Sequence, residues 1–182
     1  MEELGVTVNM RHFAGDQPSP RAAVLSDGRI AFTFLTDNGV PDGDRGVRAR
    51  FFNSGGIADG PEMTIGDDSA GDHVNPAVTA VSSSGLAIGA TAQGSNEGFG
   101  TIKIYRYSLD KDAIGDPIVL AENTAAEDGE SLGNQGQLAM VGTKDNRLIV
   151  GYTDATPGDG ETVSEVRVQF MEFDYGTIEV TP

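Results

Sequence analysis

Short runs of alternating apolar and polar residues, separated by turns rich in Gly, Asp and Ser, occur along the whole chain. Between residues 21 and 66 the order is RAAVL, the turn SDGR, IAFTFLTD, an acidic loop, VRARFFN and, after a second turn, PEMTIG. In the third run Val47 and Ala49 alternate with Arg48, which is typical of a strand with one buried and one wet face. These four runs predict one four-stranded antiparallel unit.

Two further copies of this unit follow at intervals of about 55 to 65 residues, and repetition at such a period indicates a propeller or another strand-rich array. The first hairpins are predicted at 21–25 with 30–36, 77–81 with 86–91, and 137–141 with 147–153. Gly28, Gly85 and Asn146 hold the same place in these hairpins, where a tight turn needs positive φ.

The third and fourth runs complete each unit. The third runs are 47–53, 102–108 and 166–170, and the fourth runs are 62–66, 117–122 and 177–181. Apolar residues take the first and third places of each third run, and these are expected to be buried. Residues 5–10 resemble a further fourth run. The chain therefore divides as a single repeat domain, 1–182, with an N-terminal strand and junction at 1–17 and repeats at 18–73, 74–131 and 132–182.

The predicted fold is all-β: three four-stranded antiparallel repeats arranged as propeller-like blades, with a β-sandwich as the alternative. Phe34, Ala90 and Tyr152 end the second strand of their repeats. We expect Phe34 and Tyr152 to be buried between neighbouring sheets, because large apolar side chains at equivalent strand positions fill the space between layers.

The repeat resembles the tandem repeats of large secreted bacterial proteins of the RTX, or haemolysin-type calcium-binding, class. The residues that carry the resemblance are Pro20, Val24, Leu25, Asp27 and Gly28, the run at 46–53, and the run from 70 through Pro76. The resemblance implies a non-enzymatic structural or binding module that is extracellular or displayed on a cell surface.

The charge and composition of the chain argue against several classes of function. The chain of 182 residues has a formal charge of −16 and no cysteine. A strongly negative field repels nucleic acid and anionic membranes, and the absence of thiols excludes disulfides and thiolate metal sites. No stretch approaches the roughly 18 apolar residues of a membrane span. We therefore expect no nucleic-acid partner and no membrane insertion.

The acidic loops are the candidate metal ligands. Calcium takes about six to eight oxygen ligands, and clustered carboxylates in Gly-rich loops supply them. The candidates for a calcium site are Asp37, Asp42, Asp44, Asp154, Asp159 and Glu161. The alternative is that these loops are simply solvated. His12 and His73 are expected to be polar turn residues.

The chain contains no nucleophile elbow, phosphate-binding loop or zinc-protease motif, and enzyme activity is not expected. Besides the surface module, two other functions fit the pattern: a virion structural protein, such as a phage capsid decoration or fibre component, and a sialidase-like or glycosidase-like propeller, which needs opposed carboxylates. Because three blades are too few to close a ring, we expect a homo-oligomer or larger assembly that pairs through the terminal strands, at 6–10 or 178–181.

Overall fold

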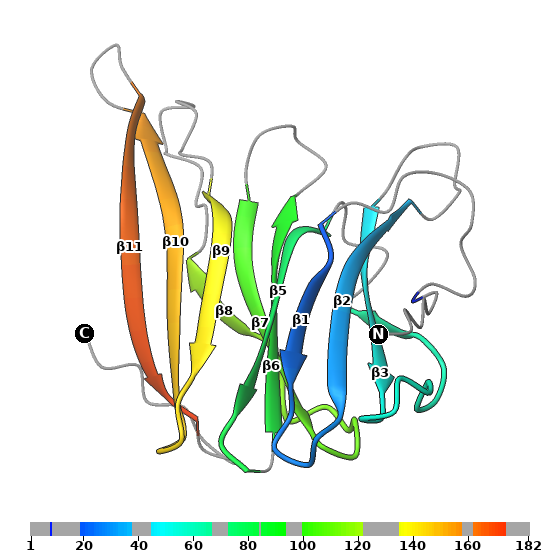
Figure 1. Ribbon diagram of the computed structural model, residues 1–182. Coiled ribbons are helices and arrows are strands. Elements are labelled where there is room, and N and C mark those ends of the chain that lie inside the picture. The colour runs from blue at the N-terminus through cyan, green and yellow to red at the C-terminus, as the bar shows by residue number, and fades with distance from the viewer. Residues whose placement is uncertain are drawn as a thin grey trace, which may run out of the picture.

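Three antiparallel sheets make up the described structure (Figure 1). The computed structural model describes residues 8, 19–37, 45–66, 73–83, 85–93, 100–121, 135–157 and 162–173, and within these ranges there is no helix. The described residues therefore contain no helix long and apolar enough to cross a membrane. The all-β prediction is confirmed.

Each sheet corresponds to one predicted repeat, and each is an up-and-down meander. Sheet A contains β1 (Arg21–Val24), β2 (Ile30–Asp37), β3 (Arg45–Phe52) and β4 (Met63–Ile65). Sheet B contains β5 (His73–Val81), β6 (Gly85–Gln93), β7 (Gly100–Ser108) and β8 (Ile118–Ala121). Sheet C contains β9 (Gln135–Gly142), β10 (Arg147–Pro157) and β11 (Thr162–Glu172).

All four predicted runs thus form strands in the first two repeats, and the first three do so in the third repeat. The predicted strand at 177–181 lies outside the described residues. Of the predicted strand at 5–10 only Val8 is described, so the structure does not test either terminal strand.

Sheet B lies between the other two sheets and is buried on both faces. Leu86, Ile88 and Tyr107 of sheet B belong to the core shared with sheet A. Ile102 and Ile104 of sheet B belong to a second core, shared with sheet C. A strand that is buried on both faces is stabilised by apolar side chains on both faces. For this reason β6 and β7 are more continuously apolar than a strand with one solvated face.

The first strands of the sheets, β1, β5 and β9, contact one another in that order and lie side by side across Figure 1. The backbones of β5 and β9 approach each other closely. A Cβ atom at Gly142 would overlap the carbonyl oxygen of Ala80, so only glycine permits the two backbones to come this near. Gly142 N also donates to Oγ1 of Thr79 over 2.9 Å.

The hairpin turns agree with the prediction in two repeats and differ in one. Gly28 has φ of 85° and Asn146 has φ of 61°, as expected for the left-handed residue of a three-residue hairpin turn. In the second repeat the prediction was wrong, because Gly85 lies in β6, opposite Val81, and not in the turn. Of the described turn residues 82 and 83, Ser82 has positive φ, at 54°. The loop of this hairpin, 82–84, is as long as 26–28 and 144–146 in the other two, so Gly85 takes the place that Arg29 and Arg147 hold there.

Phe34 and Tyr152 are buried as predicted, with exposed fractions of 5% and 3%. Tyr152 lies in the core between sheets B and C. Phe34 is on a different kind of surface. It pairs across the sheet with Arg48, on the face of sheet A that points away from sheet B, so among the described sheets Phe34 does not lie between two of them as expected.

Candidate interaction surface

The predicted calcium ligands fall mostly outside the described residues. Asp42, Asp44, Asp159 and Glu161 are not described, and for Asp37, the last residue of β2, only the backbone is described. Asp154, in β10, is half-buried and forms an ion pair of 2.8 Å between its Oδ2 and Nε of Arg167. Within the described ranges no group of three His, Asp or Glu side chains lies close enough to hold a metal ion.

His73 is not a turn residue, and that prediction was wrong. It begins β5, is 1% exposed, and its Nε2 lies 3.3 Å from the hydroxyl of Tyr105. The sequence predicted that this strand begins at Ala77, after Pro76, whereas it begins at His73 and passes through a bulge between Val74 and Ala77, where proline is tolerated. Gly66, with φ of 87°, lies directly against both rings and brings the end of sheet A onto sheet B.

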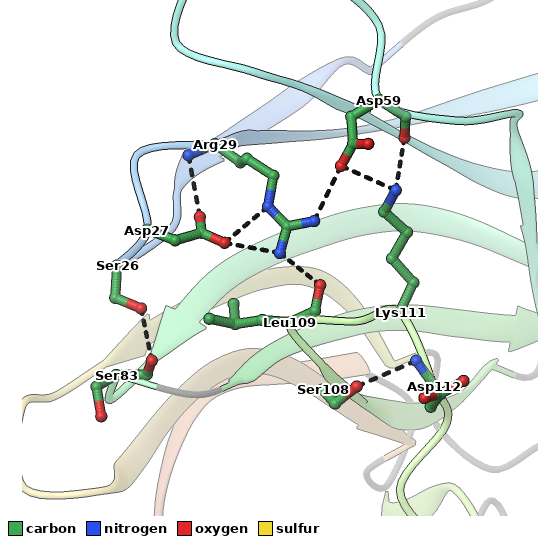
Figure 2. A network of polar contacts seen from close by, with 9 residues as sticks. All are labelled: Ser26, Asp27, Arg29, Asp59, Ser83, Ser108, Leu109, Lys111 and Asp112. Carbon is green, nitrogen blue, oxygen red and sulfur yellow. Dashed lines mark hydrogen bonds and ion pairs between the residues drawn. The ribbon is translucent and has the colours of Figure 1, made fainter.

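A network of charged residues fastens one end of sheet A to sheet B (Figure 2). Arg29, in the turn before β2, donates from Nε to Asp27 Oδ2 over 2.7 Å and from Nη1 to Asp59 Oδ2 over 2.9 Å. Its Nη2 donates over 2.5 Å to the carbonyl oxygen of Leu109, which follows β7 of sheet B. From the sheet B side, Lys111 Nζ donates to the Asp59 carbonyl oxygen over 2.6 Å.

The electrostatics of this network keep its carboxylates ionised. The hydrogen bond from Arg29 lowers the pKa of Asp27, and hydrogen bonds from Lys111 and Arg29 lower the pKa of Asp59. Because its cations and carboxylates satisfy one another, we interpret this cluster as a structural clamp and not as a reactive centre. This clamp was not predicted from the sequence, since Arg29 and Lys111 belong to different repeats.

An open depression of about 530 Å³ lies where the three first hairpins meet. Its lining combines hydroxyls, one amide and one ammonium group with a few apolar side chains: Val24, Leu25, Ser26, Ala80, Ser82, Ser83, Gly142, Thr143, Lys144 and Asn146. Ser26 Oγ donates to the Ser83 carbonyl oxygen over 2.8 Å and holds two of the turns together. None of the described residues that line this depression is a carboxylate, so they do not supply the acid pair that a glycosidase requires.

Sheet C presents an apolar surface to solvent. The exposed fractions are 59% for Val141, 77% for Val166, 53% for Val168 and 56% for Phe170. Cross-strand pairing of Ile149 with both Phe170 and Val141 puts these side chains on one face. Since Met171 and Tyr152 point into the core with sheet B, this face points away from it. We call these four residues the outer face of sheet C.

The same repeat positions are buried in the other two sheets. The first and third apolar places of the third run are Val47 and Ala49 in β3 and Ile102 and Ile104 in β7, all 0% exposed. In β3 they pack on sheet B, and in β7 they pack on sheet C. The prediction that such places are buried is therefore confirmed for two repeats and wrong for the third, because no described sheet follows sheet C.

No protein-family model matches the chain, and no curated protein is significantly similar to it. The function is therefore argued from the fold and from its surfaces. Of these surfaces, the outer face of sheet C departs furthest from what a solvated β-sheet normally presents, since its strands carry valine and phenylalanine where a wet face carries polar side chains.

Proposed function

We propose that the protein is a non-enzymatic structural and binding module that works within an assembly, with its three sheets acting as propeller-like blades. The observation that carries this proposal is the outer face of sheet C, where four large apolar side chains are each more than half exposed. Contiguous exposed apolar patches of this kind mark interaction sites in soluble proteins.

The arrangement of the sheets supports the comparison with propeller blades. Each sheet is a meander that packs face to face on the next, and the first strands β1, β5 and β9 are neighbours. A closed propeller has about four to eight blades. Three blades leave one face of the last sheet without a following sheet, and Val166, Val168 and Phe170 lie on that face.

We further propose an extracellular or cell-surface location, with a virion as the alternative. The resemblance to secreted calcium-binding repeats favours the first. A sialidase-like or glycosidase-like propeller is the less favoured alternative, because the described residues that line the depression at the hairpin turns include no carboxylate.

The proposal is tested by the size of the protein in solution. Sedimentation velocity and light scattering over a range of about 1 to 100 µM, which brackets the affinities of ordinary protein interfaces, measure the mass of the particle. We expect the average mass to rise with concentration. A mass equal to that of one chain across the whole range contradicts the proposal that the protein assembles with itself.

A further inference from the structure

We propose that a second copy of the same chain covers the outer face of sheet C, and that the two copies meet through identical surfaces related by a two-fold axis. This inference rests on the proposed function and names the partner. The dimer interface is the apolar set Val141, Val166, Val168 and Phe170, so that two C sheets pack face to face.

The first argument is continuity with contacts already present in the molecule. The positions now exposed on β11 correspond to the positions on β3 and β7 that make the contacts between sheets A and B and between sheets B and C. In both contacts this face packs on the opposite face of the next sheet, which shows that it is a sheet-packing face, and the second argument decides whether its partner is an opposite or an identical face. Sheet C has the same apolar face, and no sheet among the described residues covers it.

The second argument separates self-pairing from head-to-tail stacking. In a head-to-tail ring, the outer face of sheet C would pack on the opposite end of another copy, which is the face of sheet A that points away from sheet B. The chain itself covers much of that face: Phe34 is 5% exposed, Arg50 is 4% and Phe52 is 3%. Arg50 Nη1 donates to the carbonyl oxygen of Val8 over 2.6 Å, and its guanidinium stacks 5.2 Å above the Phe52 ring.

The third argument is charge. With a net charge of −16, two copies repel each other over most of their surfaces. Val141, Val166, Val168 and Phe170, together with the half-buried Ile149 between them, carry no charge. This face can therefore approach an identical face without bringing carboxylates together, which makes it the favoured surface for self-association among the described residues.

The test starts from a matched pair of charge insertions. Val168→Glu puts a carboxylate in the centre of the proposed interface, at a side chain that is 53% exposed. Ile57→Glu makes an equivalent change on a loop of sheet A, at a side chain that is 68% exposed. We expect Val168→Glu to weaken association by about tenfold or more and Ile57→Glu to leave it unchanged, because only the first change buries charges in a dimer.

Mixing experiments then test the symmetry. In a two-fold interface Val168 of one copy lies near Val168 of the other, so Val168→Glu and Val168→Lys each repel themselves but attract one another. We expect an equimolar mixture of the two variants to associate more strongly than either variant alone. In a head-to-tail interface each contact contains one residue 168, and mixing brings no recovery. Circular dichroism checks that each variant is folded. Val166→Glu, at the 77% exposed position, provides a second charge insertion in the same face if Val168→Glu misfolds.

The outcomes separate this inference from the proposed function. If the wild-type protein is a single chain at all concentrations, both fail. If it assembles and Val168→Glu behaves like Ile57→Glu, the protein assembles through another surface, such as its terminal strands, and only the present inference is overturned. If Val168→Glu weakens assembly but the mixture shows no recovery, the face is used head to tail and the two-fold arrangement is wrong.

Discussion

At the scale of single residues, Arg29 shows how one side chain joins elements that are distant in the sequence. Its guanidinium donates to Asp27, to Asp59 and to the Leu109 carbonyl oxygen, and its side chain is 20% exposed. A planar guanidinium can make such divergent contacts, whereas a lysine at this position would make fewer of them. The contact with Leu109 matters most, because it crosses from sheet A to sheet B.

Replacement of Arg29 by alanine should therefore lower the free energy of unfolding by about 1 to 2 kcal/mol, as expected for charge-assisted hydrogen bonds at a partly exposed site. Arg21→Ala is the matched control. The Arg21 side chain is exposed and donates to the carbonyl oxygen of the adjacent Pro20. Urea unfolding of the two variants gives the comparison, and equal losses would show that the clamp adds nothing to stability.

The same clamp makes a prediction about pH. The pKa values of Asp27 and Asp59 are lowered in the folded protein by their contacts with Arg29 and Lys111. Such groups stabilise the fold fully above the pKa of a free aspartate, about 3.9, and lose that contribution as the pH falls through their lower folded values.

We therefore expect the stability difference between wild type and Arg29→Ala to be constant from about pH 7 to pH 5 and to shrink below about pH 4. Urea unfolding at several pH values measures it. A difference that stays the same down to about pH 2 would mean that the carboxylates of the clamp are not the groups that Arg29 stabilises.

At the scale of elements, the sequence was informative wherever local chemistry decides the structure. Turn residues with positive φ and strict alternation fixed the hairpins around Gly28 and Asn146. The failures have a common cause. Gly85 was placed in the turn because its pairing with Val81 across the hairpin is not evident from its own run, and His73 was misread because its burial depends on Tyr105, which lies in another strand. Neither neighbour is visible in a single run of sequence.

The same reason explains the candidate surface. The pattern of β11 is that of a strand with one buried face, and locally it does not differ from β3 or β7. Whether Val166 and Val168 are buried depends on whether another sheet follows, which is a property of the whole array. The clamp at Arg29 was equally invisible, because its partners come from separate repeats.

Gly142 provides the prediction at this scale. Because a Cβ there would overlap the Ala80 carbonyl oxygen, Gly142→Ala must push β5 and β9 apart, and we expect a loss of about 3 kcal/mol or more in unfolding free energy. Gly151→Ala, in the next strand, is the control. Its Cβ would find its nearest neighbour, the Arg167 carbonyl oxygen, at 3.9 Å, which is an ordinary contact. Similar melting temperatures for both variants would contradict the close approach of the two strands.

At the scale of the whole molecule, charge is the dominant feature. The chain contains 28 acidic and 12 basic residues, and several of the described cations are used in pairs such as Arg167 with Asp154. The surplus carboxylates repel one another, and this repulsion destabilises the compact state at low ionic strength. Stability should therefore depend on salt whether or not the acidic loops hold a metal ion.

The two interpretations of the acidic loops differ in which salt stabilises the protein. If Asp42, Asp44, Asp159 and Glu161 are solvated, sodium and calcium should raise the melting temperature equally at matched ionic strength, because both act by screening over a Debye length of about 10 Å at 0.1 M salt. This is the expected result.

A calcium site would instead give calcium an additional effect that saturates with its concentration, since a ligand that binds only the folded state stabilises it by mass action. Differential scanning fluorimetry in paired sodium and calcium series, after dialysis against a chelator, separates the two. An added stabilisation by calcium that is lost in Asp42→Asn or Asp159→Asn would overturn the solvated interpretation and assign the metal to that loop.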